Sequence, residues 1–442
     1  MEILIKAAQL LLSLSILVIV HEFGHFITAK MFGTRVEKFY LFFDPWFSLF
    51  KFKKGETEYG IGWLPLGGYV KISGMMDESM DKAQLEKPAE PWEFRSKKTW
   101  QRLIIMLGGV TLNVLLAFII YIGMLWAWGE EYLPNSQVKY GVAVDSIGMQ
   151  MGIKNGDKIL ALDGKPVEDF LKIPNQIILN QVKTISVERD GKPADLTVPG
   201  GLIGTIIKQK KSSFLMPRVP FCIAAFGKNS GAKAAGLKKD DQIISIDTIK
   251  VQFHDQFLAK IKKYAGKTVK IGALRGSDTV YYNIPVRTDG TIGVYAFTLP
   301  AKFFTFSKHE YTFLQAIPAG FGKTITGIDN YLKQLKLLFS KEAKAYESVG
   351  GFISIGNIFP AAWDWQAFWH LTAFLSIMLA ILNVLPIPAL DGGHVMFLLY
   401  EMITGRKPSE KFMEYAQIVG MVLLLALLVF ANGNDIFKLF KH

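Results

Sequence analysis

The chain has 442 residues, enough for two or three domains, and half of its residues are hydrophobic. Its mean hydropathy of +0.25 is high for a soluble protein and predicts a polytopic membrane protein. The net charge of +12 comes with no nucleic-acid motif, and a single cysteine, Cys222, excludes an internal disulfide framework and a cysteine-based zinc site.

The first predicted element is a membrane span over residues 7–29, within a segment 1–30. Its apolar run Ala7–Val20 leads straight into His21-Glu22-Phe23-Gly24-His25 with no cleavage site, so we expect it to be retained. On a helix, His21 and His25 project from one face and can hold a single zinc ion, and Glu22 can take a proton from zinc-bound water. The alternative is a chance meeting of two core histidines and a glutamate, but ionisable groups inside a span are costly and usually functional.

A long loop, 31–102, follows and contains a predicted β-hairpin. Phe50–Lys53 alternates, Lys54-Gly55-Glu56 is a turn signal, and Thr57–Trp63 is extended again. The apolar, glycine-rich tail Leu64–Lys71 suits a strand that dips into the membrane and offers its edge to an extended peptide. A soluble appendage is the alternative interpretation.

The second span, 103–128, ends in Trp126 and Trp128, which suit a membrane interface. It contains Gly108-Gly109 and Asn113. Close helix packing through the glycines and a direct role at the metal site both explain these residues.

The next region repeats itself. Gly152–Asp163 matches Gly236–Asp247, and the register continues beyond both segments. The repeated pattern, a Gly-apolar-x-x-Gly-Asp turn before a strand, resembles PDZ domains, predicted here over 129–205 and 215–299. PDZ folds bind extended chain ends by strand addition, whereas rigid spacers without a ligand remain the alternative.

An amphipathic and interfacial segment, 300–368, precedes a third span over 369–394. This span carries Asn383 and Asp391, and a short basic loop with the fourth span fills 395–442. Two crossings separate His25 from Asp391, so both lie at one membrane face, and the positive-inside rule places that face in the cytoplasm and the repeats outside. A catalytic zinc needs three protein ligands and an open position, which His21, His25 and Asp391 supply.

Two motifs together carry a family resemblance. An HExxH pattern is present at His21–His25, and an NxxPxPxxDG pattern at Asn383–Gly392. With the Gly67-Gly68-Tyr69 hairpin tail, the Gly109-x-x-x-Asn113 element and the tandem repeats, the chain resembles the site-2 protease family of intramembrane zinc metalloproteases. It is most similar to the bacterial RseP-type members with two PDZ domains.

The resemblance implies a zinc metalloendopeptidase with one Zn2+ per chain, bound by His21, His25 and Asp391. It implies that Glu22 is the general base and acid, and that Asn383 holds the substrate or polarises the scissile carbonyl. Substrates would be single-pass membrane proteins, such as anti-sigma factors shortened by an upstream site-1-type protease, and remnant signal peptides. The enzyme would lie among the lipids of the inner membrane, with its active site toward the cytoplasm and its PDZ domains in the periplasm. We expect a structural or supporting role for His394, because a fourth protein ligand would close the site to water.

The predicted fold is therefore a polytopic α-helical membrane protein. It has four transmembrane helices, a membrane-associated β-hairpin region and two inserted PDZ-like α+β domains. A membrane-anchored PDZ scaffold with a vestigial zinc site is one rival, although it has no need of Glu22. A metal transporter is another, but four spans without an inverted repeat argue against it.

Overall fold

The computed structural model describes the chain except for residues 66, 76–87, 210–212, 339, 341–349 and 441–442, and for the side chains of Lys208, Gln209, Glu410 and Leu439. The described chain divides into two compact units. The first comprises Met1–Gly129, Glu310–Leu335 and Val349–His442, and the second comprises Glu130–His309 and Lys336–Ser348. Each is described by itself.

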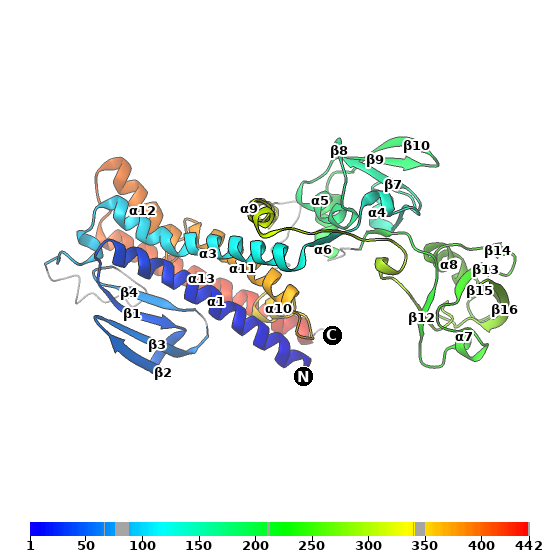
Figure 1. Cartoon of the computed structure of the whole chain (residues 1–442), viewed down its shortest axis with the longest axis horizontal. Coiled ribbons are helices and arrows are strands. Elements are labelled where there is room, and N and C mark those ends of the chain that lie inside the picture. The colour runs from blue at the N-terminus through cyan, green and yellow to red at the C-terminus, as the bar shows by residue number, and fades with distance from the viewer. Residues whose placement is uncertain (66, 76–87, 210–212, 339, 341–349, 441–442) are drawn as a thin grey trace. The chain divides into compact units, whose positions relative to one another are not determined.

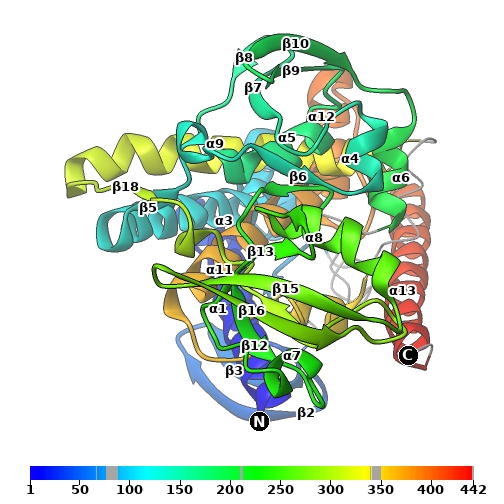
Figure 2. The same cartoon turned by 90° about the vertical axis from the view of Figure 1, so that its right-hand side faces the viewer.

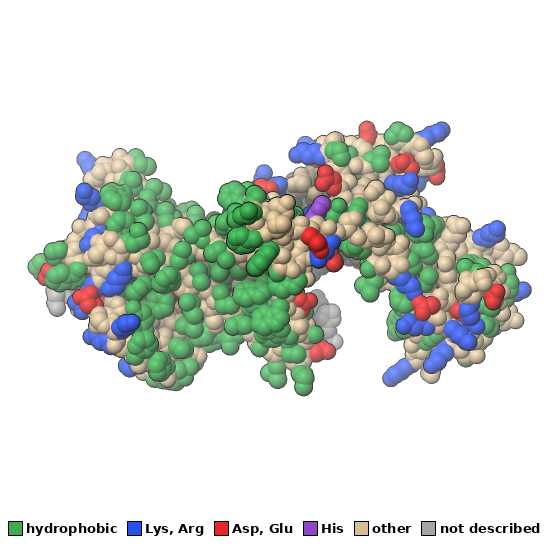
Figure 3. Space-filling view, viewed as in Figure 1, with side chains coloured by type: hydrophobic (Ala, Val, Ile, Leu, Met, Phe, Trp, Pro, Cys, Tyr) green, Lys and Arg blue, Asp and Glu red, His purple; other side chains and the backbone are tan. Residues whose placement is uncertain are grey.

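Four helices of the first unit are long and apolar enough to cross a membrane, which confirms the four predicted spans. They are α1 (Glu2–Met31), α3 (Thr99–Trp128), α11 (Trp365–Val384) and α13 (Glu410–Phe440). At 1.5 Å per residue, even the 20 residues of α11 extend about 30 Å, the thickness of the hydrocarbon core. Hydrophobic side chains cover the visible face of this unit between its ends, whereas charged side chains gather over the repeats (Figure 3). The helices of this unit therefore suit a lipid environment.

Helices α1, α3 and α11 form the core of the membrane unit, and α1 and α3 run side by side (Figure 1). Their backbones approach closely where Gly24 of α1 meets Gly108 of α3, since a Cβ on either residue would overlap the other's backbone. Between α1 and α11, the buried hydroxyl of Thr372 donates to Ser13 at 3.0 Å. Small and hydroxyl-bearing residues are the usual means of tight helix packing in a membrane.

A four-stranded sheet lies beside α1 (Figure 1) and has the order β2-β3-β1-β4. Its strands are β1 (Val36–Leu41), β2 (Phe43–Lys54), β3 (Thr57–Leu64) and β4 (Tyr69–Ile72). The predicted hairpin is confirmed as β2 and β3, paired from Lys54 opposite Thr57. Strand β1, which the sequence did not reveal, pairs in parallel with β3 and antiparallel with β4. Parallel pairing joins segments that are distant in sequence, so no local turn signal predicts it.

Two tyrosines fasten the sheet internally. Tyr40 donates to Glu58 at 2.7 Å, and Tyr69 donates to Asp44 at 2.8 Å. Burial and the hydrogen bond to Glu58 raise the pKa of Tyr40 to about 12, and burial with the Asp44 contact also raises the pKa of Tyr69. Both phenols therefore stay protonated and remain donors, so Tyr40 joins β1 to β3 and Tyr69 joins β4 to β2.

The Asn-Pro-Asp segment differs from the prediction. Helix α11 ends at Val384, so the third span does not continue to 394, and Asp391 begins a separate helix, α12 (Asp391–Thr404). Pro386 and Pro388 explain the break, because proline lacks the N–H a helix needs and restricts the residue before it. The basic loop predicted from residue 395 is also mostly helix. The far end of α12 is held by Arg102, which donates to Glu401 at 2.6 Å.

Helices α9 and α10 complete the membrane unit. Helix α9 (Phe313–Leu338) lies within the predicted amphipathic and interfacial segment, 300–368, and its Gly320 packs against Ile122 of α3. Helix α10 (Phe352–Gly356) is fastened to α13, since Asp435 accepts hydrogen bonds from the backbone N–H groups of Gly351 and Ser354 at 2.9 and 2.8 Å.

The second unit contains two four-stranded sheets of the same design, ordered β10-β9-β7-β8 and β14-β13-β15-β16 (Figures 1 and 2). The strands of the first are β7 (Lys158–Leu162), β8 (Lys165–Pro166), β9 (Thr184–Arg189) and β10 (Lys192–Thr197). Those of the second are β13 (Gln242–Ile246), β14 (Ile249–Lys250), β15 (Thr268–Arg275) and β16 (Asp278–Pro285). The intervening helices are α4 (Ser146–Gln150), α5 (Ile173–Leu179), α6 (Leu202–Gln209), α7 (Gly231–Ala234) and α8 (His254–Ile261).

Three strand pairs complete this unit. They are β5 (Glu130–Tyr132) with β18 (Ser307–His309), β6 (Val142–Val144) with β11 (Leu215–Pro217), and β12 (Ile223–Phe226) with β17 (Val294–Ala296). The pairing of β11 with β6, and the burial of Phe214 in the first core, place Leu215–Pro217 with the first repeat. The predicted start of the second repeat at 215 is therefore too early, because the sequence does not show which strand covers which core.

The repeated aspartate closes the same turn in both repeats. The carboxylate of Asp157 accepts two hydrogen bonds from the guanidinium of Arg189, at 2.9 and 2.7 Å, and one from the backbone N–H of Lys154 at 2.8 Å. Asp241 binds Arg275 twice at 2.8 Å and the N–H of Lys238 at 2.8 Å. The internal repeat read from the sequence is thus a repeat of structure, and these aspartates hold turns together rather than a ligand.

Candidate metal centre

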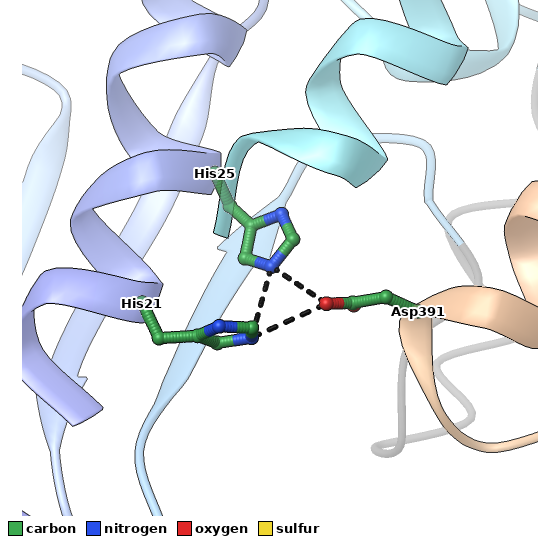
Figure 4. Close-up of side chains that lie close together, drawn as sticks. All are labelled: His21, His25 and Asp391. Carbon is green, nitrogen blue, oxygen red and sulfur yellow. Dashed lines mark hydrogen bonds and ion pairs between the residues drawn. The ribbon is translucent and has the colours of Figure 1, made fainter. Parts of the chain in front are cut away.

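The predicted ligands come together inside the membrane unit. The Oδ2 atom of Asp391 lies 3.2 Å from Nε2 of His21 and 3.2 Å from Nε2 of His25, and the two Nε2 atoms are 3.3 Å apart. The two rings meet edge to face, and all three side chains point toward one another (Figure 4). Among the described residues, these three form the one group of histidines and acids placed to hold a metal ion.

The size and chemistry of this triangle fit a zinc ion. Ligand atoms about 2.0–2.1 Å from a tetrahedral zinc are about 3.3–3.4 Å apart, close to the separations found here. The Oδ2 atom of Asp391 is buried and makes no hydrogen bond of normal geometry. A buried carboxylate oxygen without a donor is costly, so a cation is the partner that would stabilise it. Two imidazoles and one carboxylate form a catalytic zinc set, since they leave one position open.

Residues of helix α3 contact the Nδ1 atoms of the two histidines, which face away from Asp391. Nδ1 of His25 donates to the carbonyl oxygen of Ile105 at 2.9 Å, which leaves Nε2 without a proton and ready to bind a metal. Nδ1 of His21 lies 3.2 Å from the carboxamide of Asn113. Gly109 lies between these two positions on α3, and a Cβ there would overlap both histidine rings. The histidine pair on α1 therefore faces three residues spaced by four on α3.

The entire chain also resembles proteins of known family. The family model of peptidase family M50 matches residues 9–427. The chain belongs to peptidase family M50. A regulator of sigma E protease of Haemophilus influenzae is 27% identical over 460 residues, covering 99% of this chain and 100% of that protein. The regulator of sigma-E protease RseP of Salmonella typhimurium is also 27% identical, over 469 residues with the same coverage. A Neisseria meningitidis protein provisionally named a zinc metalloprotease is 28% identical over 450 residues, 96% of this chain and 97% of its own.

These findings confirm the resemblance to the site-2 protease family. The M50 peptidase is a zinc metalloendopeptidase, as predicted, and its four apolar helices make it a multi-pass membrane protein. Zinc is the cofactor that its relatives' names indicate, and the chemistry of His21, His25 and Asp391 fits that ion.

Two further predicted residues lie at the same place in this M50 peptidase. Asn383, near the end of α11, points its carboxamide nitrogen at Nε2 of His21 from 3.3 Å. Glu22 is partly buried on α1, and its Cγ would lie 3.3 Å from a Cβ on Gly68. His394, one turn beyond Asp391, is partly buried and is not a member of the metal cluster.

The sequence did not identify the residues behind the histidines. Asn113 could be read equally well as a packing residue, and the Ile105 carbonyl carries no signal because every residue has one. Gly68 was seen only as part of a glycine-rich tail. The regular spacing of Ile105, Gly109 and Asn113 would have been a clue only if α3 had been known to face the histidines.

Proposed function

We propose that this M50 peptidase binds one zinc ion through His21, His25 and Asp391 and hydrolyses a peptide bond in the membrane-spanning segment of a single-pass protein. The observation that carries the proposal is the ligand triangle itself, with edges of 3.2, 3.2 and 3.3 Å among helices long enough to span a bilayer. A zinc ion there would supply a Lewis acid that lowers the pKa of water to about 7.

Glu22 then transfers the protons, and Asn383 stabilises the negative charge that develops during the reaction. Glu22 takes a proton from the attacking water and passes it to the leaving amide nitrogen, because it is the acid adjacent to the first ligand. Asn383 presents its carboxamide N–H group on the same side as His21, where it can donate to the oxyanion that forms on the scissile carbonyl. Gly68 leaves the Glu22 side chain room, since it presents no Cβ to it.

The substrate has to be extended before it is cut. A transmembrane helix has all its backbone groups paired, so its carbonyl is reached only after local unwinding. Strand β4 pairs with β1 along one edge, and among the described residues no strand covers its other edge. We infer that β4, which begins next to Gly68 and thus near Glu22, captures the unwound segment by strand addition.

The identity of the substrates follows from the relatives and the repeats. The names of two relatives concern regulation of sigma E, which supports anti-sigma factors as one substrate class, with remnant signal peptides as another. We assign the two repeats to the PDZ fold and place them in the periplasm, where they would admit only proteins already shortened by a site-1-type protease. The active site would then face the cytoplasmic side of the inner membrane, as the basic residues near the span ends favour.

The test pairs a zinc count on detergent-purified full-length protein with a cleavage assay on a model transmembrane substrate. Wild type should hold one zinc and cut, Glu22→Gln should hold zinc without cutting, and Asp391→Ala should lose zinc. Cleavage by Glu22→Gln at the wild-type rate would overturn the mechanism. Wild type that holds zinc but cuts no substrate, including one already trimmed outside the membrane, would instead indicate the membrane-anchored scaffold.

A further inference from the structure

A histidine binds zinc through Nε2 only when the proton sits on Nδ1. That proton has to be held there by an acceptor, which is why metal-binding histidines nearly always have a second partner. His25 has such a partner in the Ile105 carbonyl at 2.9 Å, which can only accept. The Oδ2 atom of Asp391 lies 3.2 Å from Nε2 of both histidines and attracts the proton to that nitrogen, so His21 also needs an acceptor at its Nδ1.

Asn113 is the residue that meets Nδ1 of His21. Its side chain is fully buried, and its carboxamide nitrogen Nδ2 lies 3.2 Å from that ring nitrogen. A carboxamide can turn either its oxygen or its nitrogen toward the ring by a rotation of 180°. With the nitrogen facing Nδ1, the carboxamide oxygen is buried without a partner and the proton of His21 is forced onto Nε2. With the oxygen facing Nδ1, the oxygen accepts the ring proton and Nε2 is free.

Contacts of α3 with α11 and α1 fix the position of the Asn113 carboxamide next to His21. Ser376 of α11 donates to the backbone carbonyl of Asn113 at 2.7 Å, and Gly109 lets α3 approach the two rings. Because α1 and α3 run antiparallel here, Asn113 faces His21 while Ile105, two turns away, faces His25. Each ligand histidine thus has its own partner from one face of α3.

We propose that Asn113 is a positioning residue of the zinc site, whose carboxamide oxygen accepts the Nδ1 proton of His21 and so keeps Nε2 directed at the metal. The inference rests on the proposed zinc site. It gives Asn113 a chemical role in place of a packing role. A carboxylate at this position would perform the same task, whereas an apolar side chain of the same size would not.

The experiment measures zinc affinity on full-length protein in detergent, by competition with a chelator of known affinity. Asn113→Leu keeps the volume and removes the acceptor, and it should weaken zinc binding by about 10–100-fold. Asn113→Asp restores an acceptor and should bind zinc within about threefold of wild type or more tightly. Thr111→Val, which removes an exposed hydrogen bond to the Leu107 carbonyl on the same helix and no contact with either ring, should bind zinc as wild type does.

Two further measurements separate this role from a structural one. The unfolding midpoint of the metal-free protein shows whether Asn113→Leu is folded, and Asn113→Ser, with a side chain too short to reach the ring, replaces it if it is not. Cobalt in place of zinc reports the ligand set, and its visible spectrum should change in Asn113→Leu and not in Asn113→Asp. Wild-type affinity in a folded Asn113→Leu, or equal weakening in Asn113→Asp and Asn113→Leu, would overturn the assignment. Absence of zinc from the wild type would instead overturn the proposed site itself.

Discussion

Buried carboxylates have opposite surroundings in the turns of the two repeats and in the ligand triangle of the membrane unit. In the repeats, Asp157 and Asp241 are almost fully buried, and each is satisfied by an arginine that binds both oxygens and by a backbone N–H. In the membrane unit, the buried Oδ2 atom of Asp391 makes no hydrogen bond and faces two histidine nitrogens. Both arrangements place charge where solvation is poor, yet only the carboxylate oxygen of Asp391 lacks a hydrogen-bond donor.

The difference distinguishes a structural acid from a functional one. A paired acid stabilises the fold that buries it, and removing it leaves an arginine without a partner. An acid that converges with two imidazoles costs the fold free energy and is useful only with a cation among them. The number of satisfied hydrogen bonds, rather than burial, is what separates Asp391 from Asp241.

Replacing Asp391 tests this difference between the acids and has the largest expected effect. Asp391→Ala should lower zinc affinity by more than the about 10–100-fold expected for losing a supporting residue, and cleavage should disappear with the metal. Its metal-free form should unfold no earlier than the metal-free wild type. Zinc titration, cleavage and thermal unfolding of the full chain measure these effects. Wild-type zinc affinity in this variant would remove Asp391 from the ligand set.

The next effect separates the base from the ligands. Glu22→Gln should reduce cleavage by about 10²–10⁴-fold, the range that general acid–base catalysis contributes. Zinc content should stay unchanged, since Glu22 is not in the ligand triangle. Single-turnover cleavage with a metal count checks both. A Glu22→Gln variant that has lost its zinc would place Glu22 among the ligands.

A smaller effect is expected at Gly68. A methyl group there would overlap Val18 and crowd Glu22, so Gly68→Ala should move the base and reduce cleavage by about 10–100-fold with zinc retained. Gly123→Ala is the matched control, because a Cβ at Gly123 meets no atom within 4 Å. Equal activity of the two variants would show that the backbone next to Glu22 has freedom to shift.

The smallest expected effect on cleavage belongs to the structural acids. Asp241→Asn should destabilise the second repeat by about 1.5–3 kcal/mol, since it weakens the charge-assisted hydrogen bonds of Arg275, and should leave zinc affinity unchanged. Hydrogen exchange of β13 and β15 in the full chain measures the loss, with Asp157→Asn as the equivalent change in the first repeat. A change in zinc affinity would contradict the division into structural and functional acids.

The lowered pKa of Asp241 predicts how the stability of the second repeat changes at acidic pH. Burial by itself raises the pKa of Asp241, but the hydrogen bonds from Arg275 and from the N–H of Lys238 outweigh it and lower the pKa overall. Because the folded pKa lies below the unfolded value of about 3.9, the stabilisation is present above that pH and is lost as pH falls through the folded pKa. The protection of the β13 amides relative to their intrinsic exchange rates should therefore fall below about pH 4 in wild type and depend less on pH in Asp241→Asn.

The sequence by itself determined the spans, the internal repeat and the residues of the ligand triangle. Spans and repeats are periodic features of the chain, and His21, His25 and Asp391 were selected by residue type, spacing and the number of membrane crossings. The three side chains meet in the structure, as that reasoning predicts, and their binding of zinc is our proposal. The hairpin of β2 and β3 was also predictable, because its turn is local.

Only the tertiary structure decided which groups contact the Nδ1 atoms of the two histidines. Asn113 and the Ile105 carbonyl reach the histidines because α3 crosses α1 at Gly24 and Gly108. The parallel pairing of β1 with β3, and the approach of Gly68 to Glu22, likewise join segments that no local pattern connects. Local spacing predicts which side chains share a face of one element, whereas the partner of that face depends on packing between elements far apart in the chain.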